Sequence, residues 1–169
     1  MTTTIQIGDR MPEATLNVLN DKVESVSAQA FFAAPKVVMF AVPGAFTPTC
    51  SNRHLPGYAE RFAEFEQRGI KVACLSVNDA FVMRAWAQAQ NVPPALTMLA
   101  DGNGTFAKAL GLDMDGSGFG MGLRAKRFAL YAEDGVVKIL HVEAPGEFRV
   151  SSAEAMLEAI DAIHQPGRD

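Results

Sequence analysis

The stretch Lys36-Val37-Val38-Met39-Phe40-Ala41-Val42-Pro43-Gly44 decides the fold class of this chain. Its continuous apolar run, rich in branched side chains, is typical of a strand buried on both faces of a sheet. Pro43-Gly44 ends that strand. A sheet that is buried on both faces needs helices on both sides, so the run predicts an α/β protein.

Helices and strands are expected to alternate after this run. Apolar residues at helical spacing follow it, and Gly69 is placed as the stop of the helix they form. Asp79 is placed as the cap of the next helix. The expected elements are a helix over 48–68, a strand over 70–77, a helix over 79–90, a strand over 96–100 and a short helix that ends at Gly111.

The C-terminal third predicts a hairpin followed by a helix. Asp134-Gly135 lies between the apolar segments 128–131 and 136–142, which is a strong hairpin signal. Ser151-x-x-Glu154 offers a capping box for a terminal amphipathic helix. The glycine-rich segment 116–122 is expected to be a mobile loop beside the site. The order fits a thioredoxin-like mixed sheet with helices on both faces and an N-terminal hairpin, in one domain spanning 1–169.

Composition excludes several classes of protein. The 169 residues suit a single domain, and 49% hydrophobic with 20% charged residues excludes a disordered chain. The 15 Lys and Arg against 19 Asp and Glu argue against a nucleic-acid or membrane-surface partner. No apolar run is long enough for a membrane helix, and the N-terminus lacks the regions of a signal peptide. Metal-ligand spacing is absent too. We expect a soluble, cytoplasmic protein of a reducing compartment, with no metal and no disulfide scaffold.

The segment Pro43-Gly44-Ala45-Phe46-Thr47-Pro48-Thr49-Cys50-Ser51 carries the strongest functional signal. It joins a buried strand to a helix, and open α/β sheets place their ligands at the carboxyl ends of strands. Thr47 is expected to be the N-cap, and Pro48 suits the first helical position. Cys50 then falls in the first turn, where unpaired amides and the helix dipole favour a thiolate over a thiol.

Alternatives for the cysteines and their neighbours stay open at this level. Cys50 could be a small buried apolar residue, but its context favours a reactive thiol. Arg53 and His54 can add positive potential beside it. His54 could instead be the base of a thiol hydrolase. In such an enzyme the nucleophile and the base approach each other from opposing walls of the site, which two neighbours on one helix do not do. Cys74 lies in an apolar strand and is expected to be an inert core thiol.

Several motifs resemble the peroxiredoxins, thiol peroxidases of thioredoxin-like fold. Pro43-x-x-x-Thr47-x-x-Cys50 resembles their active-site signature. The resemblance is to the type II, atypical group and extends from residue 7 to the last helix. The motifs that carry it are Val42-Pro43-Gly44-Ala45-Phe46-Thr47-Pro48-Thr49-Cys50-Ser51, His54-Leu55-Pro56-Gly57, Ala73-Cys74-Leu75-Ser76-Val77-Asn78-Asp79-Ala80-Phe81 and Arg124-Ala125-Lys126-Arg127-Phe128.

The resemblance implies a role for each matching residue. Cys50 corresponds to the peroxidatic cysteine, and Thr47 to the hydroxyl that bonds both the sulfur and the peroxide. Pro43 shields the thiol, and Thr49 borders the substrate pocket with it. Arg127 corresponds to the arginine that holds the thiolate and the peroxide oxygen.

The chemistry agrees with these implied roles. A thiolate attacks one peroxide oxygen while the other leaves with negative charge, and fixed donors stabilise that charge. The Arg127 guanidinium, the Thr47 hydroxyl and the Cys50 backbone N–H can supply them, and Cys50 becomes a sulfenic acid. Arg124 is expected to be structural support.

The resemblance also bears on how the cysteine is regenerated. Some relatives carry a resolving thiol in the loop before the last helix, where this chain has Phe148-Arg149-Val150-Ser151-Ser152. An external reductant is therefore expected: glutathione with glutaredoxin, with thioredoxin as an alternative, and no bound cofactor. A homodimer is implied, and three phenylalanines are either core or the rim of a dimer contact: Phe46, Phe81 and Phe119. The competing function is a thioredoxin-like redox sensor that also uses Cys50.

Overall fold

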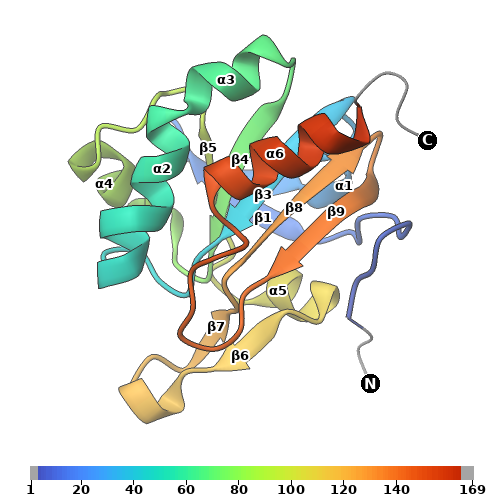
Figure 1. The fold of residues 1–169 in the computed structure, drawn as a ribbon. Helices are drawn as coiled ribbons and strands as arrows, with labels where there is room; N and C mark the ends of the chain where they lie inside the picture. Colours follow the sequence, from blue (N-terminus) through green and yellow to red (C-terminus); the bar gives the residue numbers. More distant parts are fainter. Residues whose placement is uncertain (1–3, 165–169) are drawn as a thin grey trace.

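A seven-stranded mixed sheet forms the centre of the computed structural model, which describes residues 4–164 (Figure 1). Its strand order is β2-β1-β5-β4-β3-β8-β9. The inner strands β3, β4 and β5 run parallel, and β1, β8 and β9 pair antiparallel with their neighbours. The strands are β1 (Thr15–Leu19), β2 (Val23–Ser27), β3 (Lys36–Ala41), β4 (Lys71–Ser76), β5 (Thr97–Ala100), β8 (Phe128–Glu133) and β9 (Val136–Val142).

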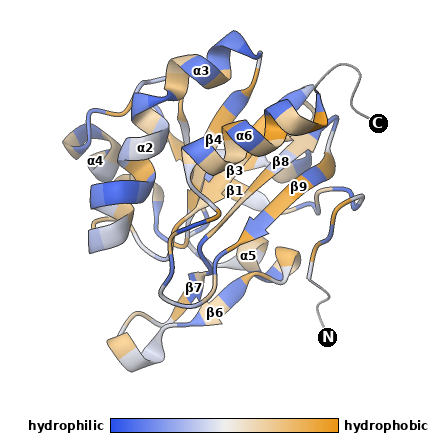
Figure 2. Cartoon of the chain, in the orientation of Figure 1, coloured by the Kyte–Doolittle hydropathy of each residue, from blue (hydrophilic) through white to orange (hydrophobic). Residues whose placement is uncertain are grey.

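Helices cover both faces of this sheet. The side chains of α2, α3, α4 and α6 share one apolar core with the sheet, and those of α1 and α5 share the other. Figure 1 shows α6 lying across the sheet, and Figure 2 shows apolar residues concentrated on the central strands. The helices are α1 (Ala28–Phe31), α2 (Leu55–Glu60), α3 (Phe62–Gln67), α4 (Ala80–Ala89), α5 (Thr105–Leu110) and α6 (Ala153–Ile163).

Strand β3 shows why the sheet needs both layers. Val38 and Phe40 lie in the core beneath α2 and α6, whereas Val37, Met39 and Ala41 lie in the opposite core. All five are fully buried, as the period-two geometry of a strand requires for an apolar run. The predicted fold class and the N-terminal hairpin, β1–β2, are confirmed. The predicted single domain 1–169 includes residues 1–3 and 165–169, which lie outside the described residues.

Local signals fixed three of the predicted boundaries. The Asp79 carboxylate accepts the Val82 N–H at 2.9 Å and caps α4. Gly69 ends α3 in the left-handed conformation, with a φ of 71°. Asp134 and Gly135 also have positive φ, as a two-residue hairpin between β8 and β9 requires.

Three predictions about local structure were wrong. The helix over 48–68 is interrupted by a π-helix, η1 (Cys50–His54), and by Arg61, whose φ of −100° and ψ of 13° leave the helical region. Ser152, not Ser151, caps α6 by accepting the Ala155 N–H. The segment 116–122, expected to be a loop, contains a short 3₁₀ helix, η2 (Ser117–Phe119), and lies between two paired strands, β6 (Asp113–Asp115) and β7 (Leu123–Ala125).

Within residues 4–164, no helix has both the length and the apolar character needed to cross a bilayer. This finding agrees with the sheet-centred architecture, in which the apolar helix faces pack against strands.

Candidate active site

The loop after β3 is held by hydrogen bonds from two neighbouring segments. Ala45 donates its N–H to Asn78 Oδ1 at 3.0 Å, and the Ser76 hydroxyl donates to the same oxygen. Arg124 donates to the carbonyl oxygens of Pro43, Val77 and Met121 at 3.4, 3.3 and 2.9 Å. The guanidinium therefore ties together three segments, which agrees with its expected structural role.

Gly44 is confined by this arrangement. A Cβ at this position would lie 3.2 Å from each of three side chains, those of Arg124, Met121 and Thr47. Its carbonyl oxygen accepts the Thr47 hydroxyl at 2.6 Å. The single hydroxyl hydrogen of Thr47 is thus directed at Gly44 and not at the Cys50 sulfur, and the lone pairs of the oxygen are left to accept from a substrate. The expected donation from Thr47 to the sulfur is wrong for this structure.

Cys50 lies in the first turn of the helix that starts at Pro48, as predicted. Its side chain is fully buried, in the core formed by α2, α3, α4 and α6. The Trp86 indole N–H donates to the hydroxyl of the adjacent Ser51 at 2.9 Å. This bond attaches the first turn to α4 and fixes the backbone that carries the thiol.

Arg127 brings positive charge to the buried thiol. It directly precedes β8, and its Nη2 donates to Cys50 Sγ at 3.0 Å. Its Nη1 lies 2.8 Å from Nδ1 of His54. Because a guanidinium is planar, these two bonds define the orientation of the whole group. The arginine next to Phe128 therefore faces the sulfur, while Arg124 binds backbone carbonyls.

His54 is a neutral link between Arg127 and the backbone. Its Nε2 lies 2.9 Å from the Ser151 carbonyl oxygen, so Nε2 carries the proton and Nδ1 accepts from Arg127. Burial and the nearby Arg127 charge lower the pKa of His54 to about 3. The expectation that His54 adds positive potential is wrong. Neither ring nitrogen faces Cys50, which argues against a base for hydrolysis.

The Ser151 backbone is held in turn by Glu143, which sequence reasoning missed. The buried carboxylate accepts the N–H groups of Arg149, Val150 and Ser151 and the Ser151 hydroxyl, at 2.7–2.9 Å. Burial alone would raise the pKa of Glu143, but these hydrogen bonds outweigh it and lower the pKa below its usual value. Glu143 is therefore an anion at neutral pH.

An aromatic side chain from the same loop covers the site. The Phe148 ring lies 4.9 Å from the His54 ring, between centroids. The Arg53 guanidinium lies 4.7 Å from the Phe148 ring centroid and that of Arg127 lies 6.0 Å from it. Phe148 thus packs against the His54 ring and attracts the two guanidinium groups through its ring face.

A cavity of about 530 Å³ adjoins these groups and is large enough for a small organic molecule. Pro43, Thr49 and Arg127 line it, and so does Phe119, which is 85% exposed. The predicted site residues Pro43, Thr49 and Arg127 therefore meet at one cavity, and Cys50 lies behind them as the sulfur partner of Arg127.

Cys74 is buried in β4 and, like Cys50, is a free cysteine. Burial and the nearby Cys50 raise the pKa of the Cys74 thiol well above its usual value. Cys74 is thus held as a neutral thiol, which is a poor nucleophile for disulfide exchange.

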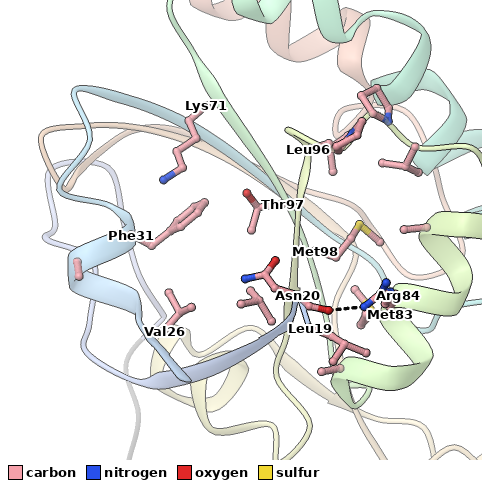
Figure 3. A pocket seen from close by; sticks show the side chains of 17 residues that line it. Leu19, Asn20, Val26, Phe31, Lys71, Met83, Arg84, Leu96, Thr97 and Met98 are labelled. Atoms are coloured by element: carbon pink, nitrogen blue, oxygen red, sulfur yellow. Dashed lines mark hydrogen bonds between the residues drawn. The ribbon is translucent and has the colours of Figure 1, made fainter. Parts of the chain in front are cut away.

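A second cavity, of about 540 Å³, lies between the β1–β2 hairpin, α1, α4 and β5 (Figure 3). The two cationic side chains that line this cavity, Lys71 and Arg84, already interact with neighbouring groups of the protein. Lys71 Nζ lies 4.1 Å from the Phe31 ring centroid, and Arg84 donates to the Asn20 carbonyl oxygen. None of the predicted site residues lines this cavity, so the chemistry of Cys50 belongs to the first cavity. The part of the chain that the structure describes also contains no group of three His, Cys, Asp or Glu that could hold a metal ion.

Comparison with known proteins identifies the family. The family model described as Redoxin matches residues 6–157. Peroxiredoxin-2E-2, chloroplastic, of Oryza sativa subsp. japonica is 48% identical over 164 residues, which cover 93% of this chain and 73% of the rice protein. Peroxiredoxin-2B of Arabidopsis thaliana is 42% identical, with 92% of this chain and 98% of that protein covered. The chain belongs to the peroxiredoxins.

The solved structures agree with this assignment. The structure of reduced Prx3 in complex with H2O2 from Vibrio vulnificus superposes with a TM-score of 0.90 at 49% identity, covering 96% of this chain and 99% of that one. The resemblance to the type II group is confirmed, and with it the thioredoxin-like fold. This peroxiredoxin is a thiol peroxidase of hydroperoxides, a class that uses no prosthetic group.

The neutral state of His54 predicts a pH dependence of stability. Between pH 6.5, its ordinary pKa, and about 3, its folded pKa, the unfolded chain binds a proton that the folded peroxiredoxin does not bind. The free energy of unfolding should therefore fall as the pH falls through this range. The variant His54→Gln keeps a hydrogen-bond acceptor and a donor at this position, but its side chain is not protonated in this pH range. Its free energy of unfolding should therefore fall less than that of the wild type.

The measurement is urea unfolding of both proteins at pH 7 and pH 4.5. We expect the wild type to lose about 2–3 kcal/mol more than His54→Gln. Carboxylates with lowered pKa values, such as Glu143, contribute equally to both proteins and cancel in the comparison. Parallel losses in the two proteins would mean that His54 is not kept neutral by the fold.

Proposed function

We propose that Cys50 is the peroxidatic thiol of a one-cysteine peroxidase that glutathione and glutaredoxin regenerate. The observation that carries the proposal is the 3.0 Å hydrogen bond from Arg127 Nη2 to the buried Cys50 sulfur. A charged donor at this distance favours the thiolate, which is the nucleophile. The similar Vibrio vulnificus protein, solved in its reduced form with H2O2, supports hydrogen peroxide as a substrate.

The oxidative step uses groups that surround the sulfur. The Cys50 thiolate attacks the nearer peroxide oxygen, an S–O bond forms and the O–O bond breaks. The sulfur is oxidised to a sulfenic acid, and the departing alkoxide or hydroxide takes up a proton to become an alcohol or water. Arg127 stabilises the developing charge, and the free lone pairs of Thr47 can accept the peroxide O–H. The apolar cavity beside Pro43 and Thr49 suits small organic hydroperoxides.

The reductive step requires a thiol that this chain does not offer in a usable form. Ser151 is buried before α6, and its hydroxyl donates to Glu143 at 2.7 Å. A hydroxyl cannot form a disulfide. Cys74 is buried in a strand and kept protonated by its raised pKa. An external thiol is the remaining reductant.

Glutathione completes a balanced cycle. Its thiolate attacks the sulfur of the Cys50 sulfenic acid, an S–S bond forms and the S–O bond breaks, and the departing hydroxide takes up a proton to become water. A glutaredoxin thiolate then attacks the glutathione sulfur, so that Cys50 leaves as the thiolate. This cycle needs a compartment that keeps glutathione reduced, and the expected cytoplasmic location meets that need.

A homodimer is the assembly we propose for this peroxiredoxin. Phe46, Phe81 and Phe119 are 55%, 65% and 85% exposed, so these side chains are not part of the apolar core. Phe46 lies in the loop that Asn78 holds, and Phe81 lies in the first turn of α4, three residues after Asn78. Phe119 borders the active-site cavity. Large exposed aromatic residues around one site are typical of an interface.

The two arginines should differ in their effect on the peroxide step. Removing a donor aimed at developing charge costs about 10²–10³ in rate, so Arg127→Gln should slow oxidation of the reduced protein by that factor. Arg124→Gln should slow it less and should lower the melting temperature, because three carbonyl oxygens lose their donor. Stopped-flow oxidation and thermal unfolding of both variants provide the comparison. A larger kinetic loss in Arg124→Gln would reverse the assignment.

Intact mass after one equivalent of peroxide tests the reductive half of the cycle. With glutathione present, the wild type and Cys74→Ser should both form a single glutathione adduct on Cys50, and Cys50→Ser should form none. Steady-state turnover should then require glutaredoxin. A Cys50–Cys74 disulfide that supports turnover with thioredoxin alone would overturn the one-cysteine mechanism. Adduct formation without turnover would favour the redox sensor.

Sedimentation velocity tests the dimer. The wild type should sediment with twice the mass of one chain, and Phe81→Asp should shift it toward the monomer because the charge would be buried at the contact. Ile7→Asp, which changes an equally exposed residue outside the three phenylalanines, should leave the dimer intact. Monomeric wild type, or dimers in all three proteins, would contradict the proposed interface.

A further inference from the structure

We infer that Glu143 is a positioning residue that fixes Arg127 against the Cys50 sulfur by way of Ser151 and His54. The inference rests on the proposed roles of Cys50 and Arg127. Glu143 follows β9, and its backbone N–H donates to the Arg127 carbonyl oxygen at 3.0 Å. Its carboxylate hydrogen-bonds to neither the Arg127 guanidinium nor the Cys50 sulfur; the side-chain hydrogen bonds of Glu143 go to residues 149–151. Its effect on the sulfur is therefore indirect.

The first step is the clamp that Glu143 places on the loop. One carboxylate receives three successive backbone N–H groups and one hydroxyl, so the peptide groups of residues 149–151 converge on a single anion. Hydrogen bonds to a charged acceptor are about twice as strong as neutral ones. A segment outside the helices and strands is thereby held in one conformation, and the Ser151 carbonyl oxygen with it.

The second step is the carbonyl oxygen itself. It lies 2.9 Å from His54 Nε2 and accepts the Tyr58 hydroxyl at 2.8 Å, and both side chains are fully buried. A carbonyl oxygen accepts and cannot donate, so the proton of His54 must be on Nε2. The position of Ser151 thus decides both the tautomer and the ring orientation of His54.

The third step transmits this orientation to the sulfur. His54 Nδ1, left without a proton, accepts from Arg127 Nη1 at 2.8 Å. Nη2 of the same planar group then lies 3.0 Å from Cys50 Sγ. A shift of Ser151 would rotate the imidazole, and a rotated imidazole would no longer hold the guanidinium in line with the sulfur. Supporting groups of this kind typically change the rates of the sites they orient.

A double-mutant cycle tests this path. The rate of loss of the Cys50 thiol to hydrogen peroxide is measured by rapid quench and mass analysis of the reduced protein, without any reductant. Glu143→Gln should slow this reaction about tenfold, equivalent to weakening one charge-assisted hydrogen bond. In the Arg127→Gln background the same change should slow it less than about twofold, because a residue that acts through Arg127 has no effect once Arg127 is gone.

Glu154→Gln is the matched control. It removes the same charge from a glutamate three residues beyond Ser151, where the side chain is 73% exposed and pairs with Arg61 at 3.4 Å. Its rate should equal that of the wild type. Equal losses for Glu143→Gln with and without Arg127 would show a general structural effect and overturn the positioning role, as would no loss at all. A wild type whose Cys50 does not react with peroxide would overturn the proposed function as well.

Ser151→Ala covers the case in which Glu143→Gln does not fold. It removes only the hydroxyl bond to Glu143 and keeps the charge and the backbone bonds. We expect about a threefold loss of rate with Arg127 present, which corresponds to a single net hydrogen bond, and none in the Arg127→Gln background. The same loss in both backgrounds would overturn the inference.

Discussion

The free charge of Arg127 is the constraint on which the active-site half of this molecule depends. Its guanidinium must be held in a half-buried position, and some of its N–H donors must remain available for the sulfur and the peroxide. A carboxylate in direct contact would hold it, but would also occupy those donors and cancel the charge. The structure uses a neutral acceptor instead, His54 at 2.8 Å, and connects the carboxylate of Glu143 to the guanidinium only through the Ser151 peptide and the His54 imidazole.

A neutral imidazole at this place requires the apolar core. His54 is fully buried, and its ring lies 5.0 Å from that of Phe40, between centroids. Phe40 stacks on Tyr58 at 3.9 Å, and the Tyr58 hydroxyl shares the Ser151 carbonyl oxygen with His54. Phe40 belongs to the strand whose apolar run decides the fold. The same burial that stabilises the sheet therefore keeps the histidine uncharged beside an arginine.

Features set by short-range chemistry could be predicted from the sequence. The two-sided strand 37–42 and the Asp134-Gly135 turn follow from period and turn residues, and Cys50 falls in the first turn because Pro48 starts the helix. The resemblance singled out Arg127, and the structure places its guanidinium against the sulfur.

Features set by distant partners could not be predicted. The Thr47 hydroxyl chooses the Gly44 carbonyl oxygen because the loop folds back on itself. Ser151 is lost as a cap because Glu143, eight residues earlier, takes both its N–H and its hydroxyl, and Ser152 caps α6 in its place. Nothing near Glu143 in the sequence signals this role, since it arises where the end of β9 meets the loop before α6.

The double use of Ser151 connects the structure of the loop to the choice of reductant. Its N–H and hydroxyl bind Glu143 while its carbonyl oxygen orients His54. A resolving thiol in this loop would have to leave its place to reach Cys50, and that movement would release His54 and Arg127 with it. An external thiol makes no such demand, so in the proposed cycle the donors stay assembled around the sulfur. Because these donors stay in place, the sulfenic acid lies beside Arg127 in a site that is still arranged to activate peroxide. In the proposed cycle, prompt capture by glutathione is what protects Cys50 from further oxidation to the sulfinic acid.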